Sequence, residues 1–166
     1  MNIVLIGMRG SGKSTVAKLL AKKLAKHFYD MDSLLVKKVG MALPEFVNKY
    51  DWELFRDKES EIADEISSMA DAVIATGGGV ILRQKNVDAL KKNGTFVFLK
   101  TSVEQMLKRI GNAKNRPSLT SKKSLKEEIE QVWKERKSLY EQAADVTIDT
   151  DNKTLDEIIE EIIKKL

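Results

Sequence analysis

Short runs of apolar residues alternate along the chain with longer segments in which apolar residues recur every three or four positions. The short runs predict strands at residues 3–6, 28–30, 72–75, 95–99 and 146–148, and we expect those at 3–6 and 72–75 to be buried. The longer segments predict helices over residues 14–26, 33–39, 44–50, 52–69, 84–92 and 124–143, with further helices opening after Ser102 and Thr154. Because strands and helices alternate, we expect an α/β fold, a five-stranded parallel sheet flanked by helices on both faces.

Three of these helices carry an apolar stripe that we expect to be buried. Within each set, spacings of three and four residues place the side chains on one side of a helix. The sets are Val16, Leu19, Leu20 and Leu24; Leu54, Phe55, Ile62, Ile66 and Met69; and Leu155, Ile158, Ile159, Ile162, Ile163 and Leu166.

The chain length of 166 residues predicts one domain, residues 1–166. Two subregions stand out within it. The segment at about 31–62 contains consecutive predicted helices and no strand, so we expect a helical insert. Residues 111–123 have no periodicity and many turn formers, which predicts a surface loop that acts as a lid.

Composition bounds the cellular setting. The chain has no cysteine, so it has neither disulfides nor thiolate metal ligands. No apolar run approaches the ~20 residues that span a membrane. The N-terminus enters a strand at once, without a signal peptide. We therefore expect a cytoplasmic protein that does not bind membranes. We also expect it to be a monomer.

The net charge of +4 raises the possibility of a nucleic-acid partner. However, lysines are interleaved with Glu and Asp along the predicted helices, and aromatic residues make up only 6% of the chain. We interpret the charge as a solvated surface around an anion-binding pocket, and expect no nucleic acid to bind.

The segment after the first strand fits a phosphate-binding loop. Its sequence is Gly7-Met-Arg-Gly-Ser-Gly-Lys-Ser-Thr15, in the spacing glycine, four residues, glycine, lysine, serine. Glycines at 7, 10 and 12 let the backbone aim N–H groups at one phosphate, and a helix N-terminus adds positive potential there. Lys13 is expected to reach the β- and γ-phosphates, and the Ser14 hydroxyl to ligate Mg²⁺. The alternative interpretation is a glycine-rich turn that has only a structural role and binds no ligand.

Polar residues follow the other strands where each ends. Asp30 and Asp32 follow the second, Gly77–Gly79 the third, and Arg109 and Arg116 lie beyond the fourth. Because ligands gather at the carboxyl ends of parallel strands, we expect these residues to share one site.

Several candidate residues also have a structural interpretation. Arg116 can be a loop charge in water. Asp32 can cap a helix instead of contacting an acceptor, and Gly77–Gly79 can be a flexible turn instead of a close approach to a ligand. Arg56 and Arg136 lie on predicted helices, where a solvated arginine is common. Glu59, three residues after Arg56, is a natural ion-pair partner.

Taken together, the motifs resemble those of the shikimate kinase family over nearly the whole chain. The motifs, in family order and spacing, are Gly7 to Thr15, Asp30-Met-Asp32, Phe55-Arg56-x-x-Glu59, Gly77-Gly-Gly79, Arg116-Pro117 and Arg136-x-x-x-Tyr140. The resemblance implies a P-loop kinase of the nucleoside-monophosphate-kinase type. It also implies transfer of the γ-phosphoryl group of ATP to the 3-hydroxyl of shikimate, in aromatic amino-acid biosynthesis.

The resemblance also implies roles for individual residues. Asp32 would hold the acceptor hydroxyls and activate one, while the shikimate carboxylate would be bound by two arginines, which suit it through bidentate contacts. By position, the family's roles are substrate binding by Asp32, Arg56, Gly78 and Arg136; catalysis by Lys13, Asp32 and Arg116; ATP binding by Gly10, Ser11, Gly12, Lys13, Ser14, Thr15, Arg109 and Arg116; and Mg²⁺ binding by Ser14 and Asp30. Glu59 would orient Arg56, and Arg109 would pack on adenine.

Three positions depart from the family pattern. Asp51-Trp52-Glu53 stands where a glycine–glutamate pair is usual, Met31 where threonine is frequent, and Ser118 where leucine is common. None removes a charged group from the expected site. They bear on the packing of the insert at 31–62, which would hold the substrate, and of the lid.

Two other classes of function fit parts of the pattern. Another small-molecule kinase, acting on gluconate or a nucleotide, would share the phosphate loop but should lack the paired arginines with the triple glycine. A nucleotide-dependent switch or adaptor would bind ATP without needing Asp32 beside Arg56 and Arg136.

Overall fold

The computed structural model describes residues 1–111 and 124–166. The expected lid therefore lies almost wholly outside the described residues, and Arg116 and Ser118 with it. The strands are β1 (Asn2–Ile6), β2 (His27–Asp30), β3 (Ala72–Ala75), β4 (Gly94–Lys100) and β5 (Val146–Asp149). The helices are α1 (Lys13–Lys23), α2 (Met31–Val39), α3 (Leu43–Lys49), α4 (Trp52–Ser67), a 3₁₀ turn η1 (Val80–Leu82), α5 (Gln84–Lys91), α6 (Val103–Ile110), α7 (Leu125–Ala143) and α8 (Leu155–Lys165).

The five strands form one parallel sheet in the order β2-β3-β1-β4-β5, which confirms the predicted architecture. β1 lies at its centre, and Val4 pairs with Ile74 on one side and Phe96 on the other. All five residues of β1 are buried, as its uninterrupted apolar run requires. The phosphate loop leaves the carboxyl end of this strand, in the middle of the sheet.

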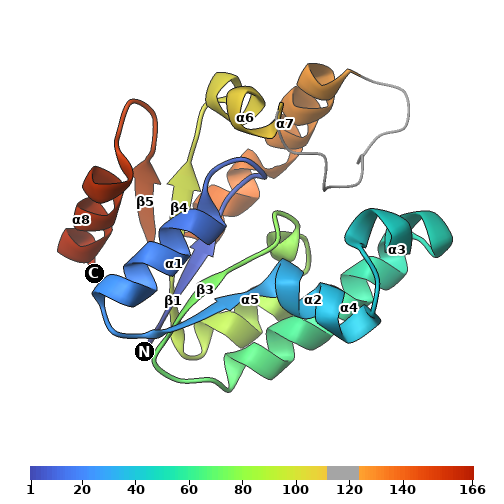
Figure 1. Cartoon of the computed structure of the whole chain (residues 1–166), viewed down its shortest axis with the longest axis horizontal. Coiled ribbons are helices and arrows are strands. Elements are labelled where there is room, and N and C mark those ends of the chain that lie inside the picture. Colours follow the sequence, from blue (N-terminus) through green and yellow to red (C-terminus); the bar gives the residue numbers. More distant parts are fainter. Residues whose placement is uncertain (112–123) are drawn as a thin grey trace.

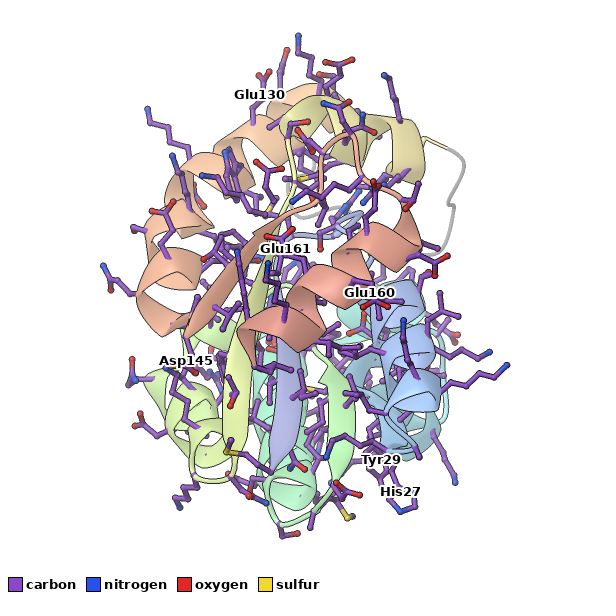
Figure 2. All side chains as sticks on the ribbon, turned by 90° about the vertical axis from the view of Figure 1, so that its left-hand side faces the viewer. His27, Tyr29, Glu130, Asp145, Glu160 and Glu161 are labelled. Atoms are coloured by element: carbon purple, nitrogen blue, oxygen red, sulfur yellow. The ribbon has the colours of Figure 1, made fainter. Side chains whose placement is uncertain are left out.

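Successive residues of β1 contribute their side chains to two separate hydrophobic cores, one on each face of the sheet. Ile3 and Leu5 pack with side chains from α1 and α8, whereas Val4 and Ile6 pack with side chains from α2 to α5 and from α7. Figure 1 shows α1 and α8 on one side of the sheet and α4 and α5 on the other. In Figure 2, α8 with its labelled Glu160 and Glu161 crosses in front of the strands, and Glu160 pairs with Lys23 of α1.

Serine and threonine caps fix several helix starts as the sequence predicts. Ser102 accepts a hydrogen bond from the Gln105 backbone N–H at the start of α6, and Ser124 opens α7 in the same way. Thr154 and Glu157 form a complete capping box before α8. These caps orient α6 and α7, which rise beside the phosphate loop.

Four expected apolar contacts are wrong. Leu19 is 38% exposed, because α1 packs on the sheet through Val16, Ala17, Leu20 and Ala21, and the two alanines allow a close approach. Met69 is 39% exposed because α4 ends at Ser67, two residues earlier than expected. Leu155 and Leu166 are 42% and 51% exposed at the two ends of α8, where the helix extends past the core.

The single histidine takes no part in the carboxyl-end site. His27 begins β2 at the opposite end of the strand from Asp30, is exposed, and is labelled near the lower edge of Figure 2. Among the described residues, no helix is both long and apolar enough to cross a membrane.

Candidate active site

The phosphate loop turns tightly between β1 and α1. Gly10 and Gly12 have φ values of +77° and +89°, a left-handed region that disfavours side chains. A Cβ on Gly10 would also lie 2.8 Å from Cγ1 of Ile110, so α6 packs directly on the loop. Lys13 is buried, and its Nζ donates to the carbonyl oxygens of Gly7 and Met8, each at 2.8 Å. The lysine charge is thereby held inside the loop.

A broad groove opens in front of this loop. Of the residues expected to bind ATP, six line it: Gly10, Gly12, Lys13, Ser14, Thr15 and Arg109. Ser11 does not line the groove, because its side chain is buried under the loop and its backbone N–H donates to the carbonyl of Met8. Arg109 donates from Nη1 to the carbonyl of Gly10 at 3.2 Å, which places its guanidinium at one edge of the groove.

Ser14 and Asp30 lie side by side in the lining of the groove. The hydroxyl of Ser14 donates to Oδ2 of Asp30 at 2.5 Å, and Oδ1 of Asp30 accepts from the backbone N–H of Ser33. Asp30 is therefore the N-cap of α2, and the alternative that Asp32 caps this helix is wrong. α2 starts at Met31, two residues before the expected start, because Asp30 supplies the cap.

These oxygens suit a magnesium ion. Mg²⁺ in phosphate-transfer sites is bound by one or two protein oxygens together with substrate phosphates and water. A hydroxyl and a carboxylate, already adjacent beside the phosphate loop, fit that donor set. Within residues 1–111 and 124–166, no cluster of three or more acidic, histidine or cysteine side chains forms a self-sufficient metal cage.

A second pocket lies beside the groove, between the triple glycine, α4 and α7. It is lined by Met8, Arg9, Asp32, Leu43, Trp52, Phe55, Arg56, Glu59, Gly77, Gly78, Gly79, Val132 and Arg136. All four residues expected to bind the acceptor, Asp32, Arg56, Gly78 and Arg136, are thus brought together from four different elements.

Arg56 is held from several sides. Its Nη1 donates to Oε2 of Glu59 at 2.9 Å, so the ion pair expected from their spacing is confirmed. Its guanidinium carbon also lies 5.2 Å from the ring centroids of both Trp52 and Phe55, within the range of cation–π attraction. These contacts fix the guanidinium at the pocket wall before any ligand binds.

Two of the three glycines are required by the site's own side chains. A Cβ on Gly79 would lie 2.1 Å from Nη1 of Arg56, and one on Gly77 would lie 2.6 Å from Oε1 of Glu59 and 3.0 Å from Oδ1 of Asp32. A Cβ on Gly78 would meet only ordinary contacts at 3.6 Å. The expectation that ligand approach explains all three glycines is therefore too broad, because Gly77 and Gly79 make room for Glu59 and Arg56.

Burial and charge shape the acid–base properties of this pocket. Glu59 is 3% exposed, and this burial raises its pKa, while Arg56 and Arg136 oppose the shift and Asp32 adds to it. Tyr140 is fully buried beside Arg136, and burial raises its pKa to about 12. Tyr140 therefore remains a protonated hydrogen-bond donor throughout the physiological range.

Sequence reasoning assigned no role to Arg9, Trp52 or Tyr140, all of which shape the site. Arg9 occupies a variable position of the phosphate loop, so the motif gives no signal for it. Trp52 and Tyr140 lie four residues before Arg56 and four after Arg136, so each shares a helix face with a functional arginine. That spacing is the available signal.

Comparison with known proteins identifies the family. The family model described as shikimate kinase matches residues 9–166. A shikimate kinase of Thermodesulfovibrio yellowstonii is 42% identical over 164 residues, which cover 99% of this chain and 94% of that protein. The chain belongs to the shikimate kinase family.

Solved structures agree with this assignment. The structure of Acinetobacter baumannii shikimate kinase in complex with shikimate superposes with a TM-score of 0.93 at 34% identity, covering 98% of this chain and 90% of that one. A gluconokinase of Sinorhizobium meliloti, at 17% identity and a TM-score of 0.58, shares the P-loop kinase fold alone.

Proposed function

We propose that this member of the shikimate kinase family transfers the γ-phosphoryl group of ATP to the 3-hydroxyl of shikimate, giving shikimate 3-phosphate and ADP. One observation carries the proposal. A pocket that contains Arg56, Arg136 and Asp32 opens directly beside the phosphate-loop groove, and Asp32 lines both. An acceptor in the pocket is then next to a nucleotide in the groove.

The charges of the pocket match a small polyhydroxy acid. Arg56 and Arg136 supply planar, bidentate donors for one carboxylate, and Glu59 holds Arg56 in position. Asp32 then contacts the hydroxyl groups at the other end and accepts the proton of the one that attacks. Gly78 offers a backbone contact between them.

The transfer itself is an in-line displacement. The 3-oxygen of shikimate forms a bond to the γ-phosphorus, the bond from this phosphorus to the β–γ bridging oxygen breaks, and its electron pair leaves with ADP. Lys13 and the loop N–H groups hold the phosphates. Arg109 lies at the groove edge, where we place the adenine. Ser14 and Asp30 would hold Mg²⁺, which supplies charge neutralisation on the phosphates. Arg116, outside the described residues, would add a further contact to phosphate.

We further propose that the protein acts as a cytoplasmic monomer that uses neither nucleic acid nor membrane. The cysteine-free composition supports the cytoplasmic location, and the interleaving of lysines with Glu and Asp argues against a nucleic-acid partner. Size-exclusion chromatography with light scattering tests the monomeric state, and a stable dimer would contradict it.

The central test measures ADP release from ATP–Mg²⁺ with shikimate, with gluconate, with a nucleoside monophosphate and with no acceptor. We expect release to depend on shikimate alone. Lys13→Ala should remove nearly all turnover, since this charge matches charge on the transferring group. Dependence on gluconate or a nucleotide would instead favour the alternative kinases. ATP binding without any acceptor-dependent release would favour a switch or adaptor.

A further inference from the structure

The groove and the acceptor pocket meet at three side chains. Arg9, Asp32 and Leu43 line both. A phosphoryl group that moves from a nucleotide in the groove to an acceptor in the pocket must pass these residues. Of the three, one is apolar, one is a carboxylate and one, Arg9, is a cation.

The Arg9 side chain is held at this junction from the far side. It is 12% exposed, and its Nη1 lies 3.5 Å from Oε1 of Glu128, a buried residue in the first turn of α7. The backbone nitrogen of Arg9 is 3.6 Å from the place that a Cβ on Gly78 would take, so the residue also adjoins the triple glycine.

The negative charge at the junction needs an opposing positive charge. Asp32 brings a negative charge to the path of a transferring group that is itself negative. Lys13 directs its amine to the carbonyls of Gly7 and Met8 within the loop. A second cation on the path, already largely removed from water, interacts strongly with phosphoryl oxygens and needs little reorganisation.

We propose that Arg9 is a further catalytic residue, which contacts the γ-phosphoryl oxygens as the group passes from ADP to the acceptor oxygen and stabilises its charge. The inference rests on the proposed function. Arg9 takes no proton in this step: the proton of the attacking hydroxyl goes to Asp32, and the electron pair of the broken bond leaves on ADP. Glu128 is a positioning residue that keeps the guanidinium at the junction.

The test compares steady-state kinetics of Arg9→Met, Arg9→Lys, Glu128→Gln and the double variant Arg9→Met/Glu128→Gln with the wild type. For Arg9→Met we expect kcat to fall by roughly 10- to 100-fold, the range for a lost donor at a site of developing charge, with both Michaelis constants within about threefold. Arg9→Lys should retain an intermediate kcat, because it keeps the charge without the planar fork. This variant also provides the test if Arg9→Met fails to fold.

A matched control removes an arginine ion pair elsewhere. Arg83 pairs with Asp57 at 2.6 Å and lines neither the groove nor the pocket, so Arg83→Met should leave kcat unchanged.

The double variant separates a catalytic role from a structural one. If Arg9 only connected the loop to α7 through Glu128, Arg9→Met would have no effect on kcat in the Glu128→Gln background. We expect at least a fivefold further loss of kcat there, of order 1 kcal/mol by RT ln 5.

The two proposals fail in different arms of this experiment. Wild-type kcat in Arg9→Met, or equal and non-additive losses from Arg9→Met and Glu128→Gln, would overturn the role of Arg9 while shikimate-dependent turnover stands. Absence of shikimate-dependent ADP release in the wild type itself would overturn the proposed function, and this inference with it.

Discussion

The hydroxyl of Tyr140 donates a hydrogen bond to the carbonyl oxygen of Gly78 at 2.5 Å. Tyr140 is fully buried, and its ring stacks on Phe98 of β4 at 5.2 Å with an interplanar angle of 15°. It follows Arg136 by four residues, so both face the same way from α7. One side chain therefore connects the sheet, the triple-glycine loop and the helix that carries a substrate arginine.

Replacing Tyr140 with Phe should weaken shikimate binding more than ATP binding. The ring and its stacking remain, but the Gly78 carbonyl loses its donor, which costs about 1–3 kcal/mol for a buried group. If half of that cost appears in the pocket, the Michaelis constant for shikimate rises by roughly 2- to 12-fold, with little change for ATP. Because burial raises the pKa of Tyr140 to about 12, the ratio between variant and wild type should stay constant from pH 6 to 9.

Asn2→Ala provides a matched loss of buried hydrogen bonds at the other end of the sheet. The Asn2 side chain donates to the carbonyl of Met69 and accepts from the backbone N–H of Ala72. This variant should melt earlier while its Michaelis constants stay at wild-type values. Equal changes for shikimate and ATP in Tyr140→Phe would show that the tyrosine supports the fold in general and not the acceptor pocket.

The glycines at 78 and 79 should respond differently to alanine. Neither glycine has a positive φ, so alanine adds no backbone strain at either position. In Gly79→Ala the new methyl group would coincide with the guanidinium of Arg56, so the guanidinium must move. Because the displaced guanidinium would leave the buried Glu59 without its ion pair, Gly79→Ala should also melt earlier than the wild type. Loss of a well-placed bidentate contact should raise the Michaelis constant for shikimate by at least about tenfold.

Gly78→Ala is the companion variant for stability, because its methyl group meets only atoms at 3.6 Å. Both variants are compared by thermal melting and by the ratio of Michaelis constants. A wild-type Michaelis constant for shikimate in Gly79→Ala would mean that Arg56 does not need its present position.

The helices, the strands and the candidate site residues could be predicted from local sequence patterns. The long-range contacts that hold the site residues in position could not. The run at Ile3–Ile6, the loop glycines and the spacing from Arg56 to Glu59 each reflect neighbours in sequence. The bond from Tyr140 to Gly78 joins residues 62 positions apart, and no periodicity encodes it. Likewise, Leu19 satisfies the helical pattern but lies outside the sheet contact, since the angle at which α1 packs is a tertiary property.

The buried Glu59 predicts a pH dependence of stability. Its pKa is raised in the folded state, chiefly by burial, although Arg56 and Arg136 oppose the shift. The folded protein therefore binds the proton more tightly than the unfolded chain does, and this contribution to stability is lost as pH rises from about 4.5 through the folded pKa. The free energy of unfolding of the wild type, relative to Glu59→Gln, should fall over that window, as measured by urea unfolding at a series of pH values. A relative stability that rises with pH would show that the pairing with Arg56 outweighs the burial.

The assignment of shikimate as the acceptor is tested most directly at Arg136 and Asp32, which line the same pocket from α7 and α2. Arg136→Ala leaves a carboxylate half paired, at a cost of about 2–3 kcal/mol in a desolvated site. The Michaelis constant for shikimate should therefore rise by roughly 30- to 150-fold, if it tracks binding, while that for ATP moves much less. Asp32→Asn keeps the size of the side chain but removes the charge that polarises the attacking hydroxyl, so it should mainly lower kcat. Equal weakening of ATP and shikimate in Arg136→Ala would show that this arginine does not bind the carboxylate.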